Sequence, residues 1–218
     1  SIVKKILFKY LHSITENKRI QNILTEQKES ADSAGWLCYR LHSLIRLSKQ
    51  NKKYVTLFSH KELFEIHEKI RILTNTYEKK YMDDGLIVSF DGETWMDSIP
   101  RSGKNIEIQC LFAQHYNLLI TLGNHDAIEK KENLLNNIRK QFFKGNVLAD
   151  NLNDPLIRPN IFIAYYLLPE LLTPVEWEQC FDTSLPLLWQ GWGGLSTIDT
   201  THHLYNPHST GQNSISYH

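Results

Sequence analysis

The chain has 218 residues, of which 41% are hydrophobic, and this is enough to bury a substantial core in one large domain or two small ones. Its 24 Lys and Arg residues balance its 24 Asp and Glu residues, so the composition shows no electrostatic footprint for nucleic acid or for an anionic membrane. No apolar run reaches the roughly 20 residues that a spanning helix needs. We therefore expect neither nucleic acid nor a membrane as a partner.

Apolar residues recur at three- and four-residue spacing along the N-terminal part of the chain, which is typical of amphipathic helices. The first predicted helix places one apolar stripe opposite lysines: Ile2, Ile6, Leu7, Tyr10, Leu11 and Ile14. A second helix is predicted after Ser30 or Asp32 as N-cap, running to about residue 48. Its buried side should comprise Trp36, Leu37, Leu41, Leu44, Ile45 and Leu47.

The same periodicity predicts further helices at about 60–80, 105–121, 127–143, 160–169 and 174–189. The last of them has the clearest start, because Thr173 precedes Pro174 at the first helical position and Glu176 completes a capping box. Only short pieces near 86–90 suggest a strand. We therefore predict an all-α protein, and the absence of a Pro-, Gly- or Ser-rich boundary favours a single domain over 1–218.

Three cysteines are scattered in apolar surroundings without CxxC spacing: Cys38, Cys110 and Cys180. This pattern favours buried, reduced thiols over a disulfide framework or a zinc site. Reduced thiols in turn favour a cytoplasmic location.

Three stretches between the predicted helices are long and rich in groups that bind polar ligands: 81–104, 144–160 and 190–218. Long loops in a compact helical domain are more often functional than structural. Together these loops hold aromatic rings, carboxylates, amides and guanidinium groups, including Trp95, Trp192, Tyr205 and Tyr217. A sugar matches this mixture, because its C–H faces stack on rings and its hydroxyls need both donors and acceptors.

Four segments give the sequence a family resemblance. They are "TWMD" at 94–97, "PRSGKNIEIQCLF" at 100–112, "LIRPNIFIAYYLLPELL" at 156–172 and "GGLSTIDTTHHLYNPHSTGQNSISYH" at 193–218. In that order, and over roughly residues 30–218, they resemble the C-terminal amylo-α-1,6-glucosidase region of glycogen debranching enzymes, the archaeal type most closely. The resemblance implies an (α/α)6 toroid whose loops form a catalytic funnel. It also implies inverting hydrolysis of the α-1,6-linked glucose at a trimmed branch point of glycogen or limit dextrin.

Within this resemblance, Asp97 of "TWMD" is the expected general acid. Departure of the leaving group from an acetal needs a protonated carboxylic acid beside the glycosidic oxygen, and a second carboxylate activates water on the opposite face. Asp97 follows Trp95 and Met96, an apolar setting that would keep its proton on at neutral pH. The alternative is that Asp97 caps a nearby helix and that Trp95 is a core residue.

The other predicted site residues bind substrate: Trp95, Arg101, Glu107, Arg158, Asn160, Asp199, His202, His203, Tyr217 and His218. Several have structural alternatives. Arg101 and Glu107 could form an ion pair that steadies the loop, and Asn160 could cap a helix. Asp32 and Trp36 resemble a D-x-x-x-W pattern of related toroids, although an N-cap and a core residue explain them slightly better.

The histidines near the C-terminus have no regular i, i+4 spacing with a carboxylate, so we expect sugar contacts there and no metal ion. No cofactor is expected either.

The sequence departs from the family in one respect. Seven or eight helices are predicted, whereas an (α/α)6 toroid has twelve, and no motif for the catalytic base is found within 1–218. We therefore expect an incomplete toroid segment that lacks its closing helices, with the base on a missing or partner segment, and a complementary protein chain that completes the toroid as a heteromer. The alternatives are a non-catalytic glucan-binding or regulatory module, or a glucoamylase-like hydrolase of α-1,4 ends. An exposed apolar flank should then form a large interface near residues 2–14 and near Tyr217 and His218.

Overall fold

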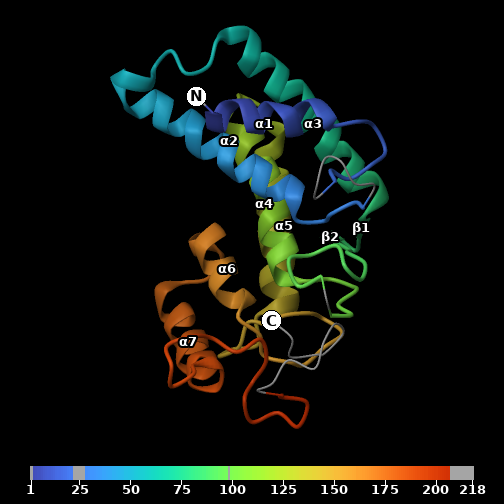
Figure 1. Ribbon diagram of the computed structural model, residues 1–218, viewed down its shortest axis with the longest axis vertical. Coiled ribbons are helices and arrows are strands. Elements are labelled where there is room, and N and C mark those ends of the chain that lie inside the picture. The colour runs from blue at the N-terminus through green and yellow to red at the C-terminus, as the bar shows by residue number, and fades with distance from the viewer. Residues whose placement is uncertain (1, 22–27, 98, 207–218) are drawn as a thin grey trace. The chain divides into compact units, whose positions relative to one another are not determined.

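The computed structural model describes residues 2–21, 28–97 and 99–206, and these residues are mostly helical (Figure 1). Its α-helices are α1 (Ile2–Ser13), α2 (Ser33–Gln50), α3 (His60–Lys80), α4 (Ile106–Thr121), α5 (Asp126–Phe142), α6 (Asn160–Leu167) and α7 (Pro174–Leu188). Two 3-10 turns, η1 (Lys52–Tyr54) and η2 (Pro169–Leu171), accompany them. Among the described residues the only sheet is the antiparallel pair β1 (Met82–Asp83) and β2 (Leu86–Ile87). The prediction of an all-α protein is confirmed.

The helix starts show how local sequence signals act. In α7 the Thr173 hydroxyl accepts a hydrogen bond from the Glu176 backbone N–H, and the Glu176 carboxylate accepts from the Thr173 N–H. This is the predicted capping box, with Pro174 at the first helical position. At the start of α2, Asp32 is the N-cap residue, but its side chain makes no capping hydrogen bond and instead accepts one from the Ser30 hydroxyl.

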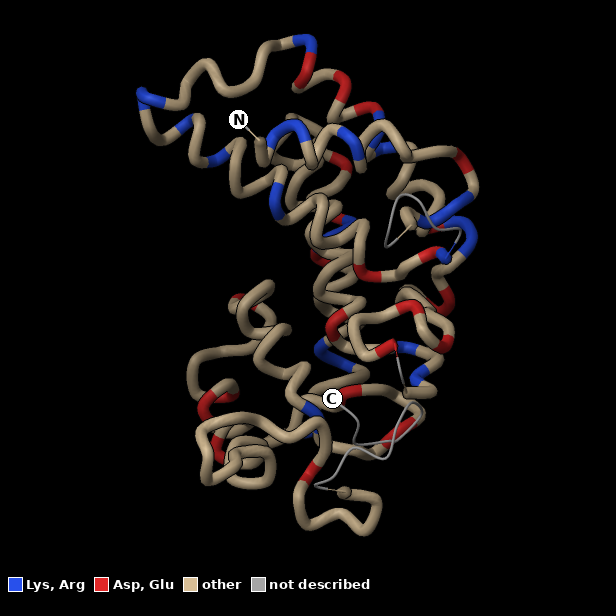
Figure 2. The backbone as a smooth tube through the Cα atoms, viewed as in Figure 1, with Lys and Arg blue, Asp and Glu red and all other residues tan. Residues whose placement is uncertain are grey.

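The chain divides into two compact units, residues 1–87 with 111–133 and residues 88–110 with 134–218. We call them unit 1 and unit 2. Lys and Arg residues are concentrated in unit 1, whereas acidic residues outnumber basic ones in unit 2 (Figure 2). The chain as a whole is therefore neutral, although unit 1 carries a net positive charge and unit 2 a net negative charge.

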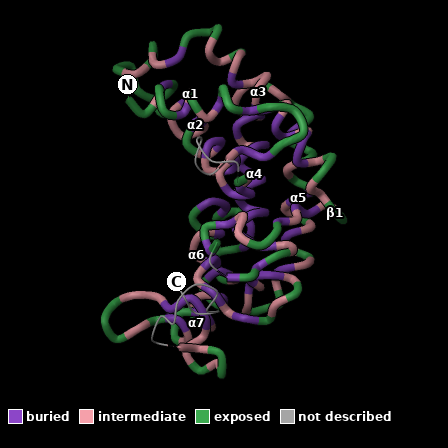
Figure 3. Tube along the Cα trace, turned by 45° about the vertical axis from the view of Figure 1, so that its right-hand side comes forward, coloured by how far each residue is buried: buried purple, intermediate pink, exposed green. Residues whose placement is uncertain are grey.

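In unit 1, helix α1 packs against α2 and α3. The core includes Leu11, Leu41 and Ile70, none of which is exposed to solvent. Figure 3 marks the buried residues along the chain in purple. Helix α2 approaches α4 closely at Gly35, where an added Cβ would lie 2.4 Å from the Cβ of Leu111. Only glycine permits this approach.

The outer part of α1 differs from the predicted stripe. Leu7 and Leu11 are buried as expected, but Ile2 is 76% exposed and Ile6 is 51% exposed. Leu47, predicted on the buried side of α2, is also exposed. Periodicity reveals which side of a helix is apolar, and it does not reveal whether another element covers that side.

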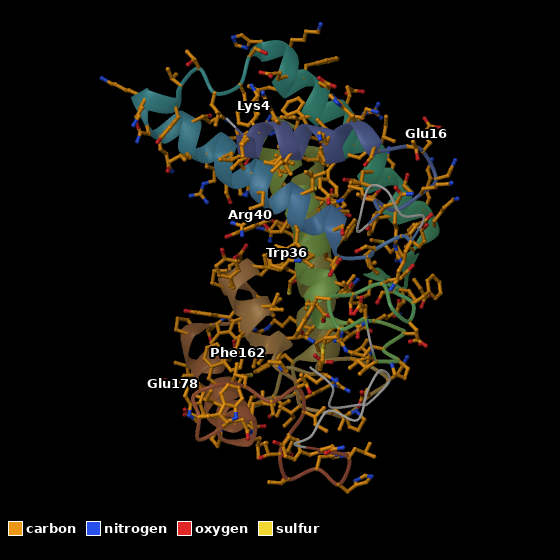
Figure 4. All side chains as sticks on the ribbon, viewed as in Figure 1. Lys4, Glu16, Trp36, Arg40, Phe162 and Glu178 are labelled. Carbon is orange, nitrogen blue, oxygen red and sulfur yellow. The ribbon has the colours of Figure 1, made fainter. Side chains whose placement is uncertain are left out.

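In unit 2, α6 and α7 are joined by aromatic packing. The Phe162 and Phe181 rings stack with their centroids 5.4 Å apart, and Tyr165 meets Trp177 edge to face. Figure 4 shows Phe162 on α6 and Glu178 on α7. The packing holds together the two helices that flank residues 168–173, and so fixes α6 just after the loop 144–160.

The three cysteines are free and buried, which confirms the prediction from their spacing. Of the helices described, none combines the length and the apolar character needed to cross a bilayer.

Candidate active site

The "TWMD" segment lies in a loop of unit 2 that is closed at its base. Backbone hydrogen bonds join Ser89 and Gly103 in both directions, at 2.9 and 2.8 Å. The buried amide of Asn105 donates to the Ser89 hydroxyl at 2.8 Å and to the Arg101 carbonyl at 2.9 Å. Gly103 has a φ of 110°, a backbone conformation that would be strained for a residue with a side chain. These bonds fix the two ends of the loop. The conformation between the ends depends on the contacts that residues such as Trp95 make with other segments.

The interior of the loop is bound to the start of α6. The Trp95 indole Nε1 donates to Oδ1 of Asn160 at 2.8 Å, and the Asn160 amide donates to Oδ1 of Asp150 at 2.7 Å. Asn160 is fully buried, and the N-cap position of α6 belongs to Pro159. Capping is therefore not the role of the Asn160 side chain, which connects three segments of the chain. The Trp95 side chain is 39% exposed, so it is not an enclosed core residue.

Asp97 is an exposed residue between two buried neighbours, Met96 and Ile99. Helix α4 begins only at Ile106, so Asp97 does not cap it. The sequence predicts an apolar setting around Asp97, and the structure differs. The apolar residues Met96 and Ile99 are buried, whereas Asp97 is exposed. The loop thus presents this carboxyl group from an anchored backbone.

Arg101 forms a buried ion-pair cluster beneath the loop. Its guanidinium donates to both Glu107 oxygens at 2.6 and 3.0 Å, to Oδ2 of Asp150 at 2.8 Å, and to the Thr94 hydroxyl at 3.4 Å. Burial alone would lower the pKa of Arg101, but attraction by Glu107 and Asp150 outweighs it and raises the pKa. The ion pair between Arg101 and Glu107 is therefore present, and direct sugar contact by either residue stays a prediction.

Arg158 adds a second buried guanidinium to this cluster. It donates to the Thr197 carbonyl at 3.1 Å, and its Nε lies 3.6 Å from Oδ2 of Asp150. Burial lowers the pKa of Arg158, although Asp150 opposes this effect. The Nη2 of Arg158 also lies 3.5 Å from Oδ2 of the less buried Asp154. The two buried guanidinium groups are thus paired with two buried carboxylates, Glu107 and Asp150, which is the condition under which buried charges are tolerated.

The segment after α7 is joined to the cluster through its backbone. The Asp199 N–H donates to the Ile157 carbonyl at 3.1 Å, while the Asp199 carboxylate accepts from the Thr201 N–H and hydroxyl at 2.7 and 2.8 Å. His202 and His203 follow with their rings 4.4 Å apart, and His203 is exposed. Within the described part of the chain, no group of three or more His, Cys, Asp or Glu residues is placed to hold a metal ion. The predicted residues Tyr217 and His218 lie outside the described residues.

A scan against protein families matches residues 3–218 to the family described as amylo-alpha-1,6-glucosidase. The chain belongs to the amylo-alpha-1,6-glucosidase family. The match confirms the resemblance found in the motifs and extends it to the N-terminal helix. A comparison with curated proteins gave no match.

The structure brings together several of the residues that the family resemblance predicts for the site. In this amylo-alpha-1,6-glucosidase family member, five of the predicted site residues meet around Asp150: Trp95, Arg101, Glu107, Arg158 and Asn160. Asp97 projects from the loop that they hold. The arrangement holds Trp95 and Met96 in place and leaves the Asp97 carboxyl group exposed.

Sequence reasoning missed Asp150, the residue at the centre of the network. It lies in the loop 144–160, 49 residues from its partner Arg101. One indirect signal was available, because two arginines, if buried, need more carboxylate partners than Glu107 supplies.

Proposed function

We propose that this chain contributes the general acid, Asp97, to hydrolysis of the α-1,6-linked glucose left at a trimmed branch point of an α-glucan. One observation supports this role best. Asp97 is exposed, while Trp95 is bonded to Asn160 and both Met96 and Ile99 are buried. A catalytic acid needs this combination of access and fixed position.

The reaction requires Asp97 to give its proton to the glycosidic oxygen as the C–O bond breaks. A second carboxylate, about 6.5–9.5 Å away in an inverting enzyme, removes a proton from the attacking water. Glu107 and Asp150 are unsuited to that second role, because both are buried and bound to Arg101. We therefore assign the base to a missing or partner segment that would complete the (α/α)6 toroid. Where a complementary protein chain supplies that segment, the active species is a heteromer.

Substrate contacts divide into direct and indirect ones. The partly exposed Trp95 ring offers a face for a glucose unit, and the Asp199, His202 and His203 side chains offer partners for hydroxyl groups. Tyr217 and His218 are assigned to the same role from the family motif alone. The buried Arg101, Glu107, Arg158 and Asn160 side chains act on the substrate chiefly by holding the loop.

The exposed apolar side of α1 supports the proposed assembly. Ile2, Val3 and Ile6 are each at least half exposed on one helix. At about 25 cal/mol per Å² of apolar surface, covering such a surface contributes to association. The buried reduced thiols support the proposal that the complex works in the cytoplasm.

Release of free glucose from a branched limit dextrin tests the function. The assay compares the chain alone with the chain mixed with a polypeptide that supplies the remaining part of the family domain. We expect release only in the mixture, and faster release from α-1,6 than from α-1,4 ends. Preference for α-1,4 ends would favour a glucoamylase-like enzyme. Dextrin binding without release would favour a non-catalytic glucan-binding module.

A further inference from the structure

The loop that follows α7 presents an exposed tryptophan. Trp189 and Leu195 form an isolated antiparallel bridge, the Gln190 N–H donates to the Gly194 carbonyl at 2.8 Å, and the Gly193 N–H donates to the Gln190 carbonyl at 2.9 Å. These bonds close a tight turn with Trp192 at its tip. Trp192 is 78% exposed, more than any other large hydrophobic residue in the described ranges.

The Trp192 ring has a defined seat in this turn. A Cβ built on Gly194 would lie 1.8 Å from Cη2 and 1.9 Å from Cζ3 of the indole. The ring therefore rests directly on the Gly194 backbone, where no other residue leaves room for it. Because the side chain is so exposed, the opposite face of the indole is open to a ligand.

The surroundings of the ring favour a neutral, polar ligand. Residues 190–198, "QGWGGLSTI", contain no charged side chain. The Gln190 side chain accepts a hydrogen bond from the Tyr205 hydroxyl at 3.4 Å and donates to the Leu188 carbonyl at 3.3 Å, which steadies the base of the turn. A flat apolar face on a turn without charged residues suits the C–H face of a sugar ring better than a phosphate or a cationic group.

We propose that Trp192, seated on Gly194, is a stacking platform for a glucose unit of an α-glucan chain, additional to the Asp97 site. The ligand class rests on the proposed function, whereas the platform rests on the geometry of the turn. The platform holds a glucan strand by contact with one sugar face, and it takes no part in bond cleavage.

Binding of linear maltoheptaose to the 218-residue chain, measured by titration calorimetry and saturation-transfer NMR, tests the platform without any hydrolysis. Trp192→Ala should weaken binding about tenfold, and Trp192→Phe should restore part of the affinity. Gly194→Ala should weaken binding to a similar extent although the tryptophan is still present, because the methyl group displaces the indole. The exposed indole can swing away, so this variant should keep its far-ultraviolet circular dichroism and its unfolding midpoint.

Gly191→Ala is the matched control, since nothing lies within 4 Å of a Cβ at this position, and it should bind like the wild type. Wild-type affinity in both Trp192→Ala and Gly194→Ala would overturn the platform. Absence of maltoheptaose binding by the wild-type chain would overturn it as well. Neither result decides the proposed hydrolysis, which is judged by glucose release and by Asp97 variants.

Discussion

Trp95 and Asn160 are 65 residues apart in the chain, yet the Trp95 indole donates a hydrogen bond to the Asn160 side chain at 2.8 Å. This bond fixes the residue two positions before Asp97 to the first residue of α6. The position of the proposed acid is therefore set by a helix as well as by its own loop. Substitutions at Asn160 should therefore change the position of Asp97, because Asn160 holds the nearby Trp95.

Asn160→Ala tests this coupling. It leaves the Trp95 N–H and an Asp150 oxygen without their buried partner, so the free energy of unfolding should fall by about 1–3 kcal/mol. Glucose release by the assembled enzyme should fall as well, with dextrin affinity less affected. Asn146→Ala, which removes an exposed amide bound to Thr183, serves as the control. It should change the unfolding free energy by no more than about 0.5 kcal/mol in urea denaturation.

Arg101→Met should be among the most destabilising single substitutions in unit 2. The change leaves Glu107 and Asp150 buried with one cation fewer, and removing one partner of a buried ion pair costs about 3–5 kcal/mol. Arg71→Met is a matched control, because Arg71 pairs with Glu68 on the exposed side of α3. That variant should cost no more than about 1 kcal/mol. Equal urea unfolding midpoints for the two variants would contradict the role given to the cluster.

Glu176→Gln should reveal a pH-dependent contribution to stability. Hydrogen bonds from Arg139 and then from Thr173 lower the pKa of Glu176 to about 2. The unfolded chain therefore takes up this proton first as the pH falls, so the stabilisation is complete above about pH 4.5 and is lost as the pH falls through about 2. The wild type should be more stable than the variant at pH 7, and the difference should shrink across that window.

Thermal unfolding between pH 7 and pH 2 provides the measurement for Glu176. Glu178→Gln, an exposed position two residues further along α7, is the control and should differ little from the wild type at any pH. A difference at Glu176 that stays constant from pH 7 to pH 2 would show that its carboxylate charge contributes nothing.

The exposed apolar side of α1 leads to a prediction about assembly. Ile2→Lys combined with Ile6→Lys should weaken association with the complementary chain at least tenfold, because charged side chains would enter an apolar interface. Val55→Lys, at an equally exposed apolar position in unit 1, should leave association unchanged. A wild-type chain that is monodisperse, unfolds cooperatively and binds no hydrophobic dye would contradict the proposed assembly.

Much of the fold was predictable because its signals are local. The start of α7 depends on Thr173, Pro174 and Glu176, which lie within four positions, and the structure shows the predicted capping box. The apolar side of α1 was also predictable, but the exposure of Ile2 and Ile6 was not. Exposure depends on what covers a helix, and that information lies elsewhere in the chain or outside it.

The candidate site divides in the same way. Arg101 and Glu107 are six residues apart, so their ion pair could be weighed from the sequence. The role of Asp150 could not, because it depends on tertiary contacts with Arg101 and Asn160. Trp192 was noted as one ring among several, and its seat on Gly194 became visible only through the backbone of the turn.

Asp97→Asn tests the central claim most directly when two substrates are compared in the assembled enzyme. Limit dextrin has a poor leaving group that needs a proton, whereas α-glucosyl fluoride has a leaving group that departs without one. We predict that the variant releases glucose from limit dextrin about 10²–10⁴ times more slowly than the wild type, while it retains most activity on the fluoride and binds dextrin normally. Wild-type turnover of limit dextrin by Asp97→Asn would contradict the assignment of Asp97 as the general acid.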